Sequence, residues 1–341
     1  MRPDSGVDQA EGLRRLLVRA RHGEAEPFCA GVPASHLLTQ SAGYASNVSE
    51  VRNQTQVIAI VAGKPGVGRT SATINLAAAL ASSGKDVLVL DENPAPNNLQ
   101  GRLGLFARYD LLDVAQGKCT PREAVLAAKG FSVLPAARAM CALVQMKRIE
   151  RQRLENALAG ISSEVDVMLV DAAMPVLGRA ERLAAVSPGL ASGAALLVVV
   201  DVTASGITES YALIKRLALE NARLHFKILV NKAVGGQAAM TVFDNMEKVA
   251  RRNLAARLEY LGYIPRDDRL KRATQLGRPV VEAFPAAVSA RAYLELPQKL
   301  LRPPARQDEA GGGARAITQS LMGQTPQPLR QHSREMPHVV N

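Results

Sequence analysis

The chain has 341 residues, a formal net charge of +11 and a hydrophobic fraction of 47%. A chain of this length and apolar content is not wholly disordered and is long enough for one large α/β domain with extensions. The low aromatic fraction of 4%, with no Trp, argues against a nucleic-acid surface built on stacked bases. The longest apolar run, residues 194–200, is much shorter than the roughly 20 residues that a membrane-spanning helix needs.

The cysteines and the first residues bear on the cellular compartment. Cys29, Cys119 and Cys141 lie far apart without the spacing of metal ligands, and their odd number does not favour a disulfide framework. The first residues lack the apolar segment of a secretory signal. We therefore expect a cytoplasmic protein with reduced thiols.

Three segments of the chain differ in composition. Residues 1–50 begin with a short helical pattern and continue as a linker rich in Gly, Ala, Ser and Pro. Residues 51–302 alternate apolar runs with amphipathic stretches, and we expect them to form the folded domain. Residues 303–341 are rich in Pro, Gly and Gln, which predicts a flexible tail.

The middle segment alternates predicted strands with predicted helices. Short apolar runs predict strands at residues 57–62, 86–90, 131–134, 165–170, 194–201, 225–230 and 258–264. Amphipathic stretches predict helices at residues 70–83, 110–116, 121–129, 146–160, 179–187, 207–221, 238–256 and 286–301. This alternation is typical of an α/β fold with a doubly wound, mostly parallel sheet, here of about seven strands. Such sheets bind ligands at the carboxyl ends of their strands.

The first predicted strand leads directly into a glycine-rich turn that opens the first helix. The spacing of the turn, Gly-x4-Gly-basic-Thr, is that of a phosphate-binding loop. Backbone N–H groups and the helix N-terminus would bind phosphate oxygens, and a Thr hydroxyl would bind Mg²⁺. The nucleotide-binding residues that we expect in this turn are Gly63, Lys64, Gly66, Val67, Gly68, Arg69, Thr70 and Ser71.

Two residues of this turn depart from the usual chemistry of a phosphate loop. Arg69 stands where a Lys is usual, and it presents a bulkier planar fork in place of a compact ammonium group. Pro65 has no N–H and removes one possible phosphate donor. Both changes predict weaker handling of the nucleotide.

The turn resembles the deviant phosphate loop of the MinD/ParA ATPases, in which a Lys follows the first Gly. Lys64 occupies that position here. The resemblance implies that the cofactors are ATP and Mg²⁺. It also implies a nucleotide-dependent homodimer in which Lys64 reaches the phosphates bound by the partner subunit.

The resemblance extends to the ends of two other predicted strands. Asp91 follows the second predicted strand and Asp171 follows the strand at 165–170. They match the two carboxylates that surround Mg²⁺ in the family. With the Thr70 hydroxyl they are the metal-site residues that the resemblance implies.

The residues expected to act in catalysis are Lys64, Arg69 and Asn93. Asn93 stands where the family has the Asp that orients the attacking water, and an amide cannot accept a proton as a carboxylate does. Pro175 replaces a Gly whose N–H senses the γ-phosphate in the family. We therefore expect ATP hydrolysis to be weak or lost.

Two downstream positions resemble the base pocket of the family. Asn231 follows a predicted strand at the position of the Asn that reads the adenine. Pro265 follows the last predicted strand, where the family closes the pocket around the base. Both are expected nucleotide-binding residues.

Within this family, residues 8–14, 203–215 and 267–281 resemble the FlhG/FleN-type regulators of flagellar number. In these regulators an N-terminal element activates the signal-recognition-type GTPase FlhF, and a Gln acts near the nucleotide of that partner. The resemblance implies that Gln9, with Leu13 and Arg14 on roughly the same helix face, contacts an FlhF-like GTPase.

The resemblance also implies the other partners of the chain. These are a flagellar transcription activator that the protein restrains, a basal-body component and, near the cell pole, the inner face of the membrane. The family uses a C-terminal amphipathic helix for membrane contact. Only the short stretch 314–322 corresponds to it, so we expect weak peripheral contact.

Two alternatives remain open at this stage. The stretch 248–278 carries nine basic residues against three acidic ones, which suits a ParA-like partition ATPase acting on DNA. The N-terminal element and Asn93 argue against this alternative. The other alternative is an interaction protein that binds no nucleotide.

Overall fold

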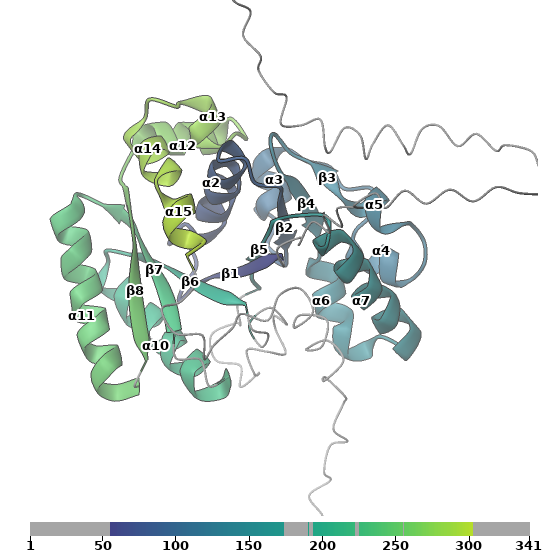
Figure 1. Cartoon of the computed structure of the whole chain (residues 1–341), viewed down its shortest axis with the longest axis horizontal. Helices are drawn as coiled ribbons and strands as arrows, with labels where there is room; N and C mark the ends of the chain where they lie inside the picture. Colours follow the sequence, from purple (N-terminus) through teal and green to yellow (C-terminus); the bar gives the residue numbers. More distant parts are fainter. Residues whose placement is uncertain (1–54, 174–189, 191–193, 222–224, 255, 303–341) are drawn as a thin grey trace, which may run out of the picture. The chain divides into compact units, whose positions relative to one another are not determined.

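The computed structural model describes residues 55–173, 190, 194–221, 225–254 and 256–302. These residues form one eight-stranded sheet with helices packed on both of its faces (Figure 1). No helix in this part of the chain combines the length and the apolarity that are needed to cross a bilayer. The expected α/β fold with a mostly parallel sheet is confirmed.

The strands lie in the order β3-β4-β2-β5-β1-β6-β7-β8 across the sheet. Apart from the antiparallel β3–β4 pair, every strand pair in the described sheet is parallel. All seven expected strands are present within a few residues. The strands are β1 (Gln56–Ala62), β2 (Val87–Asp91), β3 (Leu126–Ala127), β4 (Ser132–Pro135), β5 (Val167–Asp171), β6 (Ala195–Asp201), β7 (His225–Ala233) and β8 (Arg257–Pro265).

The short strand β3 was not expected, because the pattern at residues 121–129 predicts a helix. Only α5 (Pro121–Ala124) is helical there. Gly130 has a φ of 84°, a conformation that glycine adopts readily, and Ala128 N–H donates to the Phe131 carbonyl. The chain therefore reverses tightly, and β3 pairs with the edge of the sheet instead of continuing the helix.

The helices cover the two faces of the sheet. The expected helix at 286–301 is wrong as a single element. It is divided at Glu295, since Pro297 lacks the N–H of a helix interior and fits only the first turn of a new helix. The helix expected at 179–187 lies outside the described residues. The described helices besides α5 are α2 (Arg69–Ser82), α3 (Leu99–Leu103), α4 (Leu111–Ala115), α6 (Ala137–Ala142), the 3₁₀ turn η1 (Leu143–Gln145), α7 (Arg148–Ser162), α10 (Ala204–Asn221), α11 (Gly236–Leu254), α12 (Asp268–Gln275), α13 (Val280–Ala283), α14 (Val288–Leu294) and α15 (Leu296–Leu300).

The central strand β1 shows why the apolar runs are continuous. Ile58 and Ile60 face a core formed with α2 and α12 to α15, whereas Ala59 and Val61 face a core formed with α4, α7, α10 and α11. A strand that is covered on both faces needs apolar residues at every position. This burial places the carboxyl end of β1, and the turn that follows it, at a fixed edge of the sheet.

Candidate functional site

The glycine-rich turn between β1 and α2 has the backbone shape of a phosphate-binding loop. Gly66 and Gly68 have φ values of 82° and 101°, in the left-handed region that favours glycine. Gly68 is the N-cap residue of α2, and no described side chain caps this helix. The first N–H groups and the positive end of the helix dipole therefore face the space above the turn, as an anion site requires.

Two glycines let the turn approach its neighbours closely. A Cβ atom on Gly68 would lie 2.3 Å from Nδ2 of Asn231, and a Cβ atom on Gly63 would lie 2.2 Å from the backbone nitrogen of Ser210. Neither distance is possible for a real side chain. The turn is therefore packed against β7 on one side and α10 on the other, and only glycine fits at these two positions.

Asn231 and Lys232, at the end of β7, hold the turn through its carbonyl groups. Asn231 Nδ2 donates to the Val67 carbonyl at 2.7 Å, and Lys232 Nζ donates to the Gly66 carbonyl at 2.6 Å. Lys232 has a φ of 59°, and its own N–H donates to Asn231 Oδ1. The Asn231 amide therefore positions the phosphate loop, and the expectation that Asn231 reads an adenine stays a prediction.

A cavity of about 1100 Å³ opens above the turn, at the carboxyl ends of β1, β7 and β8. This volume is comparable to that of sites for nucleotides and other small ligands. All eight expected residues of the turn line the cavity, and so do Asn93, Asn231 and Pro265. The structure therefore brings together the nucleotide-binding positions predicted from widely separated parts of the sequence.

The lining of this cavity is strongly basic. Among the described residues that line it, seven are basic and only two, Glu209 and Asp267, are acidic. Arg266 and Lys271 come from the basic stretch 248–278, which the sequence alone could equally assign to a DNA-binding surface. This lining favours a polyanionic ligand. The basic residues are Lys64, Arg69, Arg102, Arg216, Lys232, Arg266 and Lys271.

Beneath the cavity, the strand-end carboxylate of Asp171 is completely buried and bound on both oxygens. Its Oδ2 accepts from Thr70 Oγ1 at 2.9 Å. Its Oδ1 accepts from Arg69 Nε at 2.8 Å and from Thr73 Oγ1 at 3.3 Å. The positive charge of Arg69 thus neutralises the carboxylate, while Thr73 is a partner that the sequence did not reveal.

Asp91 is also completely buried, at the neighbouring strand end. It accepts the backbone N–H groups of Asn93, Leu99 and Gln100 at 3.2, 3.1 and 3.4 Å. Burial, together with the nearby charge of Asp171, raises the pKa of Asp91 to about 7, against the lowering effect of the three N–H donors. Asp91 is therefore close to half-protonated near neutral pH.

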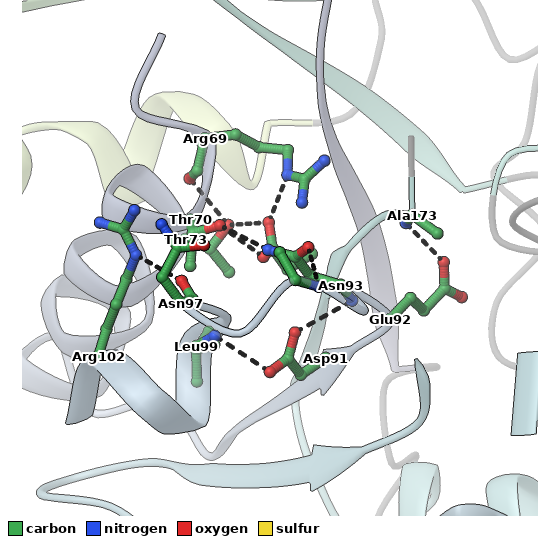
Figure 2. Close-up of polar contacts among 12 residues, drawn as sticks. Arg69, Thr70, Thr73, Asp91, Glu92, Asn93, Asn97, Leu99, Arg102 and Ala173 are labelled. Atoms are coloured by element: carbon green, nitrogen blue, oxygen red, sulfur yellow. Dashed lines mark hydrogen bonds and ion pairs between the residues drawn. The ribbon is translucent and has the colours of Figure 1, made fainter. Parts of the chain in front are cut away.

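Asn93 bridges the end of β2 and the start of α2. Its Nδ2 donates to Thr70 Oγ1 at 3.3 Å, and its Oδ1 accepts the Ala95 N–H at 3.2 Å (Figure 2). The amide therefore points a donor at the hydroxyl oxygen that was expected to bind Mg²⁺. A carboxylate at this position would present an acceptor instead.

Thr70, Asp91 and Asp171 lie together as expected, but their arrangement does not fit a firmly held Mg²⁺. Such an ion needs free oxygen ligands. Both Asp171 oxygens already accept hydrogen bonds, one of them from a guanidinium, and Asn93 donates to Thr70.

Lys64 contacts its own chain. Its Nζ donates to Ser205 Oγ at 2.6 Å and to Thr203 Oγ1 at 3.2 Å, at the start of α10. A reach to a partner subunit would require these two hydrogen bonds to break. The expected partner-binding residues Gln9, Leu13 and Arg14, the membrane stretch 314–322 and Pro175 all lie outside the described residues.

Comparisons with known proteins agree with this geometry. The family model described as the CobQ/CobB/MinD/ParA nucleotide binding domain matches residues 58–280. The chain is 36% identical over 246 residues to the antiactivator FleN of Pseudomonas aeruginosa, covering 72% of this chain and 86% of FleN.

Solved structures show the same fold. The MinC:MinD cell division protein complex of Aquifex aeolicus contains a chain that is 25% identical with a TM-score of 0.56, covering 74% of this chain and 99% of that one. MinD of Pyrococcus horikoshii, complexed with Mg-ADP, is 22% identical with a TM-score of 0.54, covering 73% of this chain and 96% of that one.

Proposed function

Because the chain belongs to the CobQ/CobB/MinD/ParA family of nucleotide-binding domains, we propose that its cavity binds ATP and that the nucleotide controls assembly with other proteins. The single observation that carries this proposal is the phosphate loop. Its left-handed glycines, its uncapped helix start and its basic surroundings meet at one cavity. Together they form a site for a nucleotide polyphosphate.

The biological role that we propose is regulation of flagellar number. Its support is the similarity to the antiactivator FleN, which extends over most of both chains. In this role the nucleotide-bound protein forms a homodimer, contacts an FlhF-like GTPase through Gln9, Leu13 and Arg14, and restrains a flagellar transcription activator. Binding to a basal-body component and weak membrane contact near the cell pole belong to the same proposal.

Catalytic turnover is not needed for this role. A ligand shifts an assembly equilibrium by its different affinity for the two states, whether or not it is hydrolysed. Asn93 places an amide at the position where the family has a water-orienting carboxylate. We therefore propose a switch that is governed by nucleotide binding and that hydrolyses ATP weakly or not at all.

Equilibrium titration with a fluorescent ATP analogue, followed by competition with unlabelled ATP, tests nucleotide binding directly. Gly68→Ala should abolish binding, since its Cβ would collide with Asn231. Gly84→Ala is the matched control: Gly84 has a similar φ of 85°, lies away from the cavity and has no described atom within 4 Å of the added Cβ. Equal affinities for Gly68→Ala and the control would contradict the proposed site.

The biological role is tested by deleting the gene in its host and counting flagella per cell. We expect more flagella after deletion and restoration by the wild-type gene but not by the Gly68→Ala gene. An unchanged number of flagella after deletion would refute the regulatory role. Nucleotide binding would still be decided by the titration.

A further inference from the structure

We propose that the Arg69 guanidinium takes the place of the divalent cation, so that a nucleotide polyphosphate binds this site without Mg²⁺. The inference rests on the proposed nucleotide site and adds how that site balances charge. It concerns a residue that differs from the usual phosphate loop, because Arg69 stands where such a loop usually has a Lys.

The position of the Arg69 side chain is the first observation. The side chain is only 11% exposed, and its Nε is bound to the buried carboxylate of Asp171. Its two terminal nitrogens have no partner among the described residues, and Arg69 lines the cavity. An arginine has five N–H donors, of which one is used here. The guanidinium therefore connects Asp171 with the space above the phosphate loop.

A bound Mg²⁺ makes the same connection in other phosphate-loop proteins. There the ion is held between the loop hydroxyl and the strand-end Asp, and it bridges two phosphate oxygens. Arg69 meets both requirements with its own atoms. It neutralises Asp171 through Nε, and its planar fork matches two phosphate oxygens with parallel charge-assisted hydrogen bonds.

A lysine in this position would act differently. The ammonium group of Lys is a compact point charge and cannot bind a buried carboxylate side-on while directing a fork of donors at a phosphate. With Arg69→Lys, we expect Asp171 to lose its guanidinium partner and a divalent cation to become necessary for tight binding.

Two further features of the site also disfavour a bound divalent cation. The described lining holds seven basic residues against two acidic ones, so the protein itself supplies the charge that offsets a polyphosphate. Asn93 Nδ2 donates to Thr70 Oγ1, so the expected metal-binding hydroxyl already receives a hydrogen bond from a neutral amide. Both features lower the affinity for a second cation beside Arg69.

The test is the affinity of the full chain for a fluorescent ATP analogue, measured in EDTA and in excess MgCl₂. For the wild type we expect affinities that agree within about threefold, whereas Arg69→Lys should bind at least about tenfold more tightly with Mg²⁺ than without it. Arg102→Lys is the matched control, since Arg102 lines the same cavity but donates to the Asn97 carbonyl and not to Asp171. It should remain insensitive to Mg²⁺.

The outcomes separate the inference from the proposed function. Wild-type binding only in MgCl₂ would overturn the inference and leave the nucleotide site intact. Absence of binding in both buffers would refute the nucleotide site, and the inference with it. If Arg69→Lys does not fold, electron paramagnetic resonance of Mn²⁺ with nucleotide-saturated wild type decides the question. Binding of Mn²⁺ to the protein–nucleotide complex beyond its binding to free nucleotide would overturn the inference.

Discussion

Asp91 and Asp171 lie directly opposite each other at the carboxyl ends of the parallel strands β2 and β5, and neither is exposed to solvent. Two buried carboxylates at the ends of neighbouring strands repel each other when both are ionised. The protein limits the repulsion in two ways. Arg69 forms an ion pair with Asp171, and the raised pKa of Asp91 lets that residue retain a proton.

This relationship predicts how stability depends on pH in a metal-free buffer. The pKa of Asp91 is 3.8 in the unfolded chain and about 7 in the folded protein. Between these values the unfolded state loses the proton first, so the free energy of unfolding falls as the pH rises and levels off above the folded pKa.

The variant Asp91→Asn carries no ionisable group at this position, so its free energy of unfolding should not fall in this way. Relative to the wild type, its free energy of unfolding should increase by roughly 2 kcal/mol between about pH 5 and pH 7 and then stay constant. Urea denaturation in EDTA measures the difference. Asp268→Asn, which alters a side chain that is 90% exposed, is the control and should parallel the wild type. A parallel curve for Asp91→Asn would contradict the raised pKa.

A second prediction concerns the support of the phosphate loop. Asn231→Ala removes the buried hydrogen bond to the Val67 carbonyl and leaves that carbonyl without this donor. One such bond contributes about 1 kcal/mol, so the affinity for ATP should fall about five- to tenfold. The fluorescent titration measures this loss. Asn97→Ala, which removes a cavity-lining amide without a loop contact among the described residues, should change the affinity much less.

A third prediction concerns Lys64 and dimer formation. Its hydrogen bonds to Thr203 and Ser205 are exposed, so Lys64→Ala should change the free energy of unfolding by no more than about 0.5 kcal/mol. The same substitution should abolish the ATP-dependent rise in mass that sedimentation velocity would detect for the proposed homodimer. Lys85→Ala, at an exposed position after α2, should dimerise like the wild type. If Lys64→Ala dimerises at the same protein concentrations as the wild type, the lysine has no role across the interface.

A fourth prediction concerns turnover. Phosphate release by the wild type should equal that of Asp171→Asn, because Asn93 places an amide where the family has the carboxylate that orients water. The double variant Arg69→Lys with Asn93→Asp restores a lysine and a carboxylate, and we expect release with MgCl₂ to rise about tenfold or more. Wild-type turnover that disappears in Asp171→Asn would contradict the loss of hydrolysis.

Much of this architecture is readable from local sequence patterns. Continuous apolar runs identified seven strands to within a few residues, because strands buried on both faces need apolar side chains throughout. The spacing from Gly63 to Gly68, followed by a basic residue and a Thr, identified the phosphate loop. The backbone angles of Gly66 and Gly68 are ones that favour glycine. The resemblance to the MinD/ParA ATPases implied that Asp91 and Asp171 lie beside this loop, and the parallel pairing of their strand ends agrees with that placement.

The side-chain partners were not readable in this way. Arg69 and Asp171 are separated by 102 positions in the chain, and Asn231 and Val67 by 164. The basic residues Arg266 and Lys271 fitted a DNA-binding surface as well as a nucleotide cavity. Periodicity and spacing describe which residues share an element, but they contain no information on which atom a long side chain meets across the sheet. That choice depends on how the packed elements leave space and hydrogen-bond partners, and this arrangement exists only once the whole domain has folded.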